Sequence, residues 1–450
     1  LYEATFDPNA PGDGLFGGPD GILAPAPERP AGAAPAEHPI HARVRALLDP
    51  ALPELERAQR VLDARDVDVL RLVMKDRSQS AFVLLDDPAA PGGVRLEENP
   101  FGGVDRRALE RIAAIVALER LGARVALPEL LLALDDRDRL VAVHAARALL
   151  KLGSRAGVPT LLSALDGKAY ENEHAHRILR DLSGEDFGFA TDGGLSRRAA
   201  AVARARAWWT EFAAGGKRLP GEGAPYRRGD DAEVDRRISA YVEVLGGFQF
   251  LYMEQARAML SRLGPEAASF LRDALPKARG AAGATWRGGM AQVLGNVSGP
   301  EADALLAELR ADDHSAVRAR AVEASARRGG PAAIAIAAAA LADRDPTVRT
   351  AAAEALGALG GPEAEAALSA AKAPEGGAVG AAISCALYRI RPTPERFAAL
   401  EALVLGPSLA ARTAAVDALN HVSGRKVLDD PQAPESELRA ALEVWRAAAR

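Results

Sequence analysis

Residues 299–364 read GPEADALLAELRADDHSAVRARAVEASARRGGPAAIAIAAAALADRDPTVRTAAAEALGALGGPEA, and this stretch repeats itself. The tetrapeptide GPEA at 299–302 returns as GPAA at 330–333 and as GPEA at 361–364, which is a step of 31 residues each time. A second signature keeps the same register, because an Asp precedes a Val-Arg pair by five residues at both 312–318 and 343–349. A fixed period of this kind indicates a repeat architecture.

Each unit of the repeat predicts a pair of helices. Pro stands at the first position of one helix, where its missing N–H is not needed, and a polar turn near Asp follows. A second helix begins at Val-Arg and is stopped by Gly, which readily takes the left-handed backbone that ends a helix. Two helices in about thirty residues are typical of an α-solenoid, whose hairpins bury their apolar faces against their neighbours. We therefore predict an all-α solenoid.

Length and composition set the broad class of the chain. Its 450 residues are too many for one compact core and suit several domains or one extended array. Aromatic residues are only 5%, and much of the apolar 48% is Ala, so many small contacts between helices should provide the stability. The net charge of −5 gives no overall bias toward nucleic acid or acidic lipid. No run of eighteen apolar residues exists, so no membrane span is expected.

The single cysteine excludes an internal disulfide framework and a thiolate metal cluster. Cys385 lies in the apolar helical run AISCAL at 382–387, which favours a buried, inert thiol over a reactive one. The sequence opens at Leu1 instead of Met. A removed signal peptide would place the protein in the periplasm or cell envelope, and a cytoplasmic location is the alternative, so the compartment stays open.

Two tandem arrays are expected, with flanking segments. In the first array Pro128 and Pro159 open similar apolar helices, and residues 214–231, rich in Gly, Pro and charge, then read as a linker. Both arrays finish with a Trp-bearing helix that would cap the open end of the stack, at Trp208 and at Trp445. The expected segments are an irregular Pro/Gly/Ala-rich arm at 1–40, a helical lead-in and loop at 41–104, the first array at 105–213, the linker at 214–231 and the second array at 232–450.

These hairpins resemble HEAT repeats, in particular the short bacterial kind grouped with the HEAT-like repeats of phycobilisome lyases. That kind opens its second helix with Asp-x-x-x-x-Val-Arg-x-x-Ala, and residues 312–321 and 343–352 match this wording. Trp286–Arg287 is a weaker copy, and a further copy has His144 where Arg is expected. The resemblance covers roughly residues 105–445. It implies the α-solenoid fold and says almost nothing about function.

Three arginines follow the same period and are candidate partner-binding residues. Arg287, Arg318 and Arg349 are 31 residues apart, so in a solenoid they would stack as a ladder along one edge. Such a ladder could bind phosphates or an acidic peptide. Alternatively, each Arg bonds Asp or carbonyl groups in the adjoining turn, for which Asp312 and Asp343 are suitable acceptors. Both interpretations stay open at the level of sequence.

The densest aromatic group follows the linker and supplies the other candidate partner-binding residues, Phe248, Phe250 and Tyr252. A partner groove would form there if the two arrays meet at this point. Packing inside the first hairpin of the second array is the alternative. Trp208 and Trp209 present a similar choice between a ligand platform and a cap over an Ala-rich helix end.

No catalytic, cofactor or metal site is expected. The best metal-like cluster is His174 and His176 beside Glu173, but positions two apart on a helix point in different directions and a third ligand is not evident. A solvated polar face is the alternative. An Asp- and Asn-containing run at 7–13 does not keep the spacing of an EF-hand calcium loop. No Gly-rich phosphate loop, nucleophile elbow or His-Glu-x-x-His motif is present.

The sequence therefore favours a non-enzymatic scaffold or adaptor, or a subunit of a larger complex, that binds a protein partner along its helices. The arm at 1–40 is a second possible contact. An enzyme or chaperone for tetrapyrrole (bilin) attachment is the alternative from another class, and it rests on the family resemblance alone. Nucleic-acid binding by a basic ladder is a third interpretation, which the net charge of −5 disfavours.

Overall fold

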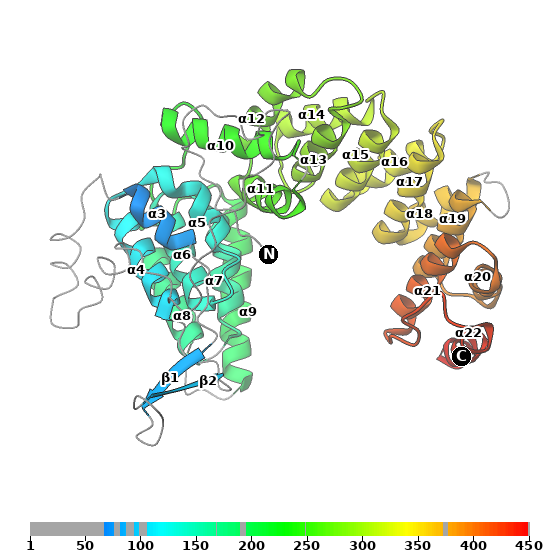
Figure 1. Ribbon diagram of the computed structural model, residues 1–450, viewed down its shortest axis with the longest axis horizontal. Helices are drawn as coiled ribbons and strands as arrows, with labels where there is room; N and C mark the ends of the chain where they lie inside the picture. The colour runs from blue at the N-terminus through cyan, green and yellow to red at the C-terminus, as the bar shows by residue number, and fades with distance from the viewer. Residues whose placement is uncertain are drawn as a thin grey trace, which may run out of the picture. The chain divides into compact units, whose positions relative to one another are not determined.

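The computed structural model describes residues 67–75, 82–86, 94–98, 106–167, 169–189, 195–247, 249–371 and 377–448. The expected arm at 1–40 and the candidate residue Phe248 lie outside these ranges. The chain divides into two compact units, and the boundary falls between Ala240 and Tyr241 (Figure 1). Among the helices of the described residues, none combines the length and the apolar character that a membrane crossing requires.

The first unit is mostly helical. Its α-helices are α3 (Val67–Lys75), α4 (Arg106–Arg120), α5 (Leu127–Ala133), α6 (Arg139–Lys151), α7 (Val158–Ala164), α8 (Ala169–Ser183), α9 (Leu195–Ala214) and the start of α10 (Ala232–Val244), which crosses the boundary between the units. Short 3-10 helices η2 (Arg124–Ala126) and η3 (Arg155–Gly157) lead into α5 and α7.

A strand pair corrects part of the sequence interpretation. Strands β1 (Phe82–Asp86) and β2 (Val94–Glu98) pair antiparallel, with Phe82 opposite Glu98, whereas the sequence predicts only helix and loop over residues 41–104. The β1 sequence FVLLD is a short continuous apolar run, which periodicity cannot assign to helix or strand. The β2 sequence VRLEE shows the alternation that a strand requires.

The predicted hairpins of the first unit are confirmed. Pro128 lies in the first turn of α5, and Pro159 holds the same place in α7. Asp138 ends the turn between α5 and α6 and caps α6, because its carboxylate accepts the backbone N–H groups of Leu140 and Val141. Apolar residues of both hairpins are buried against one another, including Leu130, Leu131, Leu149, Leu150, Leu161 and Leu165.

The sequence assigns residues 214–231 to a linker, and the part of it that follows α9 is hydrogen-bonded to other segments of the first unit. The backbone N–H of Gly223 donates to Leu150 O at 2.9 Å, and Arg155 Nε donates to Glu222 Oε1 at 2.7 Å. Gly223 approaches α6 so closely that a Cβ atom there would lie 2.0 Å from the carbonyl oxygen of Lys151. This position therefore requires glycine.

A buried group of charges also joins helices of the first unit. Glu129 of α5 accepts hydrogen bonds from Arg71 of α3, at 2.9 Å, and from Arg237 of α10. All three side chains are buried. Neither the 31-residue period nor a local motif predicts this group, because its arginines lie 58 and 108 residues from Glu129 along the chain. Removal of Glu129 would take from two buried arginines the carboxylate that they share, which is strongly destabilising.

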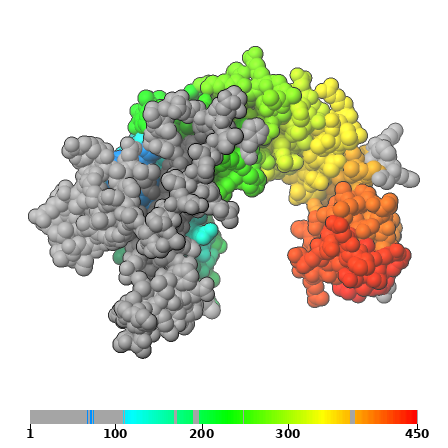
Figure 2. Space-filling model, in the orientation of Figure 1, coloured from blue at the N-terminus to red at the C-terminus, as the bar shows by residue number. Residues whose placement is uncertain are grey.

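The second unit continues with helices alone among its described residues. They are α11 (Phe250–Leu263), α12 (Glu266–Ala274), η4 (Leu275–Lys277), α13 (Ala284–Leu294), α14 (Pro300–Arg310), α15 (Ser315–Arg328), α16 (Pro331–Ala340), α17 (Pro346–Leu359), α18 (Gly361–Ala370), α19 (Ala378–Ile390), α20 (Pro394–Leu405), α21 (Leu409–Ser423) and α22 (Glu435–Ala448). Figure 2 shows the colours of this unit changing in chain order across its surface, as expected when each hairpin packs beside the next.

Most boundaries of the repeat fall where the sequence places them. Helices α14 and α16 begin at Pro300 and Pro331, as predicted, whereas α15 and α17 begin at Ser315 and Pro346, two residues before the Val-Arg pairs. Each second helix ends at a glycine with positive φ, +72° at Gly329 and +68° at Gly360. A residue with a side chain would be strained at either position. The solenoid of helical hairpins is thus confirmed.

Alanine and glycine form the contacts between neighbouring hairpins of the second unit. Helices α15, α17 and α19 pack side by side around a core made largely of Ala, with Val348, Leu356 and Ile383. At Gly357 the helices come so close that a Cβ atom would lie 2.8 Å from Ala386 Cβ. At the end of the unit, Trp445 of α22 is buried in the core formed with α20 and α21.

Candidate functional site

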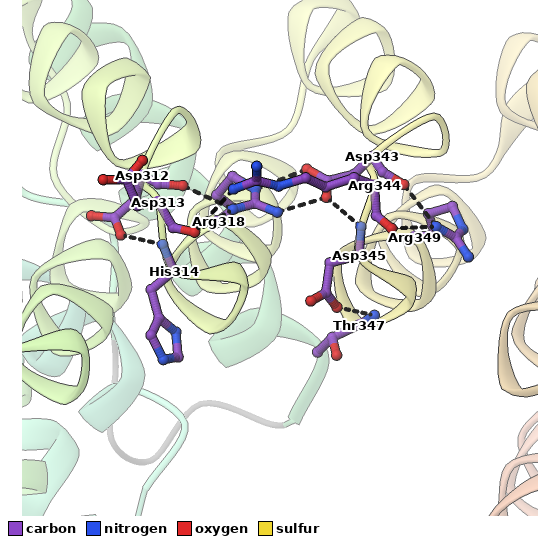
Figure 3. Close-up of polar contacts among 9 residues, drawn as sticks. All are labelled: Asp312, Asp313, His314, Arg318, Asp343, Arg344, Asp345, Thr347 and Arg349. Carbon is purple, nitrogen blue, oxygen red and sulfur yellow. Dashed lines mark hydrogen bonds and ion pairs between the residues drawn. The ribbon is translucent and has the colours of Figure 1, made fainter. Parts of the chain in front are cut away.

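Two arginines of the ladder, Arg287 and Arg318, form ion pairs within the fold, and Figure 3 shows the pair of Arg318 with Asp343. Arg287 Nε lies 2.6 Å from Asp312 Oδ2, and its Nη2 lies 3.0 Å from Oδ1. Arg318 repeats this geometry with Asp343, at 2.9 Å and 2.7 Å. We call each such pair, an Arg and the Asp 25 residues later in the next repeat, a rung. Two parallel charge-assisted bonds of this kind fix both partners in position.

Each rung also binds the turn from which its own helix begins. Arg318 Nη1 donates to the carbonyl oxygens of Asp312 and Asp313 at 2.9 Å and 3.0 Å. On the other side, Asp343 Oδ1 accepts the backbone N–H of Asp345 at 2.8 Å. Arg318 therefore bridges its own turn and the turn of the next repeat, as Figure 3 shows. Arg287 and Arg318 thus bond Asp and carbonyl groups of adjoining turns, which is one of the two interpretations that the sequence leaves open.

The electrostatics of the rungs follow from these contacts. The hydrogen bond from Arg318 lowers the pKa of Asp343, and the same bond raises the pKa of Arg318. Burial alone would raise the pKa of Asp312, but the hydrogen bonds from Arg287 and from the backbone of His314 outweigh it and lower that pKa. Both carboxylates are thus held in the charged form.

The first unit contains a rung that sequence reasoning missed. Arg111 of α4 lies 25 residues before Asp136, with its Nη2 3.0 Å from Oδ1. Asp136 Oδ1 also accepts the backbone N–H of Asp138 at 2.9 Å, as its counterparts in the second unit do. The sequence does carry a signal, because an Arg 25 residues before the turn Asp is the shared feature. The Val-Arg signature does not reveal it, because the residue before Arg111 is Glu.

Arg349 differs from the other two members of the ladder. Its Nη1 donates to the carbonyl oxygens of Asp343 and Arg344 at 2.8 Å and 3.2 Å, so the bond to its own turn is kept. The step of 25 residues leads from Arg349 to Pro374, which has no carboxylate. Arg349 is partly exposed, whereas Arg287 and Arg318 are buried, with 8% and 6% of their surface exposed.

The aromatic candidates of the second unit separate into exposed and partly buried residues. Phe250 is 73% exposed at the start of α11, and Leu251 beside it is 65% exposed. Tyr252 is partly buried, and Met253 in the same helix turn is buried. The sequence could not distinguish these residues, because which face of α11 is covered depends on helices far along the chain. Exposed neighbouring large apolar residues are unusual and often mark interaction sites.

The histidines of α8 do not converge on one point. His174 lies edge-on to His144 of α6, with ring centroids 5.9 Å apart. His176 stacks on Phe189 at 5.0 Å and lies near Asp186. Within the described residues, no group of three His, Cys, Asp or Glu side chains is placed to hold a metal ion. Burial, Arg147 and His174 lower the pKa of His144 to about 3, so this side chain is neutral in ordinary buffers.

Trp208 and Trp209 of α9 belong to an aromatic cluster of the first unit. Trp208 stacks on Phe212 at 5.1 Å and contacts Phe187 edge-on. The guanidinium of Arg155 lies 5.5 Å from the ring centre of Phe212. Both Trp side chains are partly exposed. The cluster thus packs the segment after α8 against α9. Because both Trp side chains are partly exposed, the cap and the ligand platform both stay predictions.

The lone cysteine is buried in α19, as expected. Burial raises the pKa of the Cys385 thiol to about 11. Thiolate, the reactive form, is therefore scarce near neutral pH.

A family model described as HEAT repeats matches residues 302–384 of this chain. The matched segment contains the rung from Arg318 to Asp343 and the glycine ends of α15 and α17. A search of curated protein sequences finds none that matches the chain.

Several solved structures are similar to this chain at low identity. They include human deoxyhypusine hydroxylase in complex with glycerol, with 18% identity over 79% of this chain and 96% of that chain and a TM-score of 0.21. The complex of CpcE and CpcF of phycocyanin lyase from Nostoc sp. PCC7120 has 16% identity over 93% and 99%, with a TM-score of 0.18. Kap121p bound to Nup53p has 13% identity over 91% of this chain and 52% of that chain, with a TM-score of 0.33. This chain thus spans about half the length of Kap121p.

Proposed function

Because residues 302–384 are HEAT repeats, we propose that this protein is a non-enzymatic scaffold or adaptor that binds a protein partner through exposed faces of its stacked helices. A stack of hairpins buries the inner sides of its helices and leaves a long row of outer faces accessible. In the rungs, Arg287, Arg318 and their Asp partners are occupied by ion pairs that join one repeat to the next. We therefore expect contacts to a partner from side chains outside the rungs.

The observation that carries the proposal is the exposed pair Phe250 and Leu251, 73% and 65% exposed. Burying a large apolar side chain gains about 1.5–3 kcal/mol, so leaving two of them in water forgoes a substantial stabilisation. Met253 and Ala256 already supply the buried face of α11. Phe250 and Leu251 are therefore available to a partner at the start of the second unit.

Arg349 supplies a second proposed contact. Within the described residues, Arg349 donates hydrogen bonds through Nη1 alone, to the carbonyl oxygens of Asp343 and Arg344. In Arg287 and Arg318 the other edge of the guanidinium, Nε and Nη2, binds an Asp carboxylate. We propose that a carboxylate of the partner takes this place on Arg349.

Cross-linking and affinity capture from the native organism, followed by mass spectrometry, test the proposal. The wild-type chain should retain a defined protein partner. The variant F250S/L251S should recover at least about tenfold less of it, as expected when central apolar contacts are removed. The matched control L409S/V444S removes two other exposed apolar residues, 46% and 47% exposed, and should capture the partner as well as wild type.

Two results would contradict the proposal. One is capture of the same partner by F250S/L251S in undiminished yield. The other is the absence of any partner from the wild-type sample. In that second case, a changed absorption spectrum of bilin or haem on mixing with the protein would favour the tetrapyrrole alternative.

A further inference from the structure

A surface hollow of about 480 Å³ lies in the first unit, between the turn that joins α5 to α6 and the side of α7. Residues of two successive repeats line it: Leu134, Asp136, Arg137, Arg139, Ala142, Pro159, Thr160 and Ser163. Leu134 and Ala142 are buried and form an apolar floor, whereas Arg137, Arg139 and Ser163 are exposed at the sides. The hollow therefore combines a small apolar surface with two cations.

The charges of the hollow do not cancel. Its one carboxylate, Asp136, already forms the rung with the buried Arg111, with Nε and Oδ2 2.9 Å apart. Arg139 is held by neutral groups, since its Nη2 donates to Ser163 Oγ at 2.8 Å and to Ser163 O at 3.2 Å. Asp138, next to both arginines in sequence, caps α6 and does not line the hollow. Two positive charges thus remain without a carboxylate partner inside it.

The turn at residues 343–345 of the second unit is equivalent to the turn at residues 136–138 of the first unit, and the two differ in how their arginine is bound. Residues 343–345 read Asp-Arg-Asp, as residues 136–138 do. Arg344 donates to the carbonyl oxygen of Asp313 in the preceding repeat, at 3.3 Å. Within the described part of the chain, Arg137 has no such carbonyl acceptor. Arg137 is therefore available at a position where its counterpart is engaged by the fold.

We propose that this hollow binds an acidic peptide segment of a partner protein. Carboxylates of the segment bind Arg137 and Arg139, and an apolar side chain of the segment packs on Leu134 and Ala142. Ser163 fixes Arg139 in advance, which lowers the conformational entropy lost on binding. This inference rests on the proposed scaffold function and deepens it, because it names the chemistry of a partner segment at a site distant in sequence from Phe250.

Fluorescence anisotropy of the full chain with a fluorescein-labelled peptide of repeated Glu-Ser-Glu-Leu units tests this inference. Wild type should bind the peptide, and should not bind the version in which every Glu is Gln. R137A/R139A should weaken binding by at least about tenfold, because two charge-assisted contacts are lost. The exposed charge reversal R137E should weaken it as well. The matched control R344A changes the equivalent arginine of the second unit and should bind as wild type does.

The inference is overturned if wild type does not bind the Glu peptide, if R137A/R139A binds it with wild-type affinity, or if the Gln peptide binds equally well. Tighter binding of a peptide with phosphoserine in place of Glu would assign the hollow to phosphate and also overturn it. Equal unfolding midpoints of wild type and R137A/R139A exclude misfolding as the cause of a loss. If wild type and R137A/R139A capture a native partner equally, the proposed binding of an acidic segment in the hollow is refuted, while the proposed scaffold function is not.

Discussion

Arg318 illustrates how one side chain can be read in two ways. Its spacing from Arg287 and Arg349 suits a ladder for anionic ligands, yet its guanidinium is surrounded by acceptors from the protein itself. Little of it is exposed, and both edges are engaged by Asp343 and by the turn before α15. At the scale of the residue, the repeated Arg and Asp form ion pairs that join one hairpin to the next.

Replacing Arg318 with Ala should lower the free energy of unfolding by about 2–3 kcal/mol, because Asp343 and two carbonyl oxygens lose their donor in a largely buried place. The control R320A removes an exposed arginine that pairs with Glu323 one turn away on the same helix. It should change stability by about 0.5 kcal/mol or less. Urea denaturation of both variants measures the difference, and equal midpoints would contradict the role given to the rung.

The pH dependence of these variants separates the ion pair from simple loss of packing. The pKa of Asp343 is lowered in the folded protein, so the rung stabilises the fold above the ordinary Asp pKa of about 3.9. That contribution is lost as the pH falls through the lower, folded pKa. The stability gap between wild type and R318A should therefore narrow in acid. A gap of constant size would show that packing, not charge, accounts for it.

At the scale of the element, helix ends are predictable because their signals are local. Pro300 and Pro331 begin helices, and Gly329 and Gly360 end them through backbone conformations that other residues avoid. The pair β1 and β2 was missed, because its pairing joins residues that no local period relates. The exposure of Phe250 was out of reach in the same way, because it depends on which surfaces of distant helices meet. The acceptors Asp312 and Asp343, in contrast, are suggested by the sequence, and the structure confirms them for Arg287 and Arg318.

Glycines inside helices give a matched test of helix packing. Gly357→Ala should destabilise the protein by about 1 kcal/mol or more, because the added Cβ would lie 2.8 Å from Ala386 Cβ between α17 and α19. Gly288→Ala in α13 meets nothing nearer than Arg320 Cγ at 3.8 Å. It should stabilise the protein by about 0.5–1 kcal/mol through helix propensity alone. Thermal unfolding distinguishes them, and shifts of the same sign would refute the close approach.

At the scale of the whole molecule, each unit is a row of hairpins whose stability is roughly the sum of its repeats and their interfaces. The rungs, the Ala-rich contacts and the glycine ends all serve those interfaces. Phe250 and Leu251 remain exposed, and we propose that such residues provide the contacts to a partner. The sequence predicts the array of repeats. It does not separate residues that hold the repeats together from residues that are exposed, because both kinds recur at the same interval of 31 residues.

The dissociation constant of the captured partner, measured for R318A and for F250S/L251S under conditions where both are folded, tests this division most directly. The account predicts that R318A binds the partner as wild type does although its unfolding midpoint is lower. It predicts that F250S/L251S keeps its midpoint and loses at least about tenfold in affinity. Weak binding by folded R318A, together with wild-type binding by F250S/L251S, would contradict it.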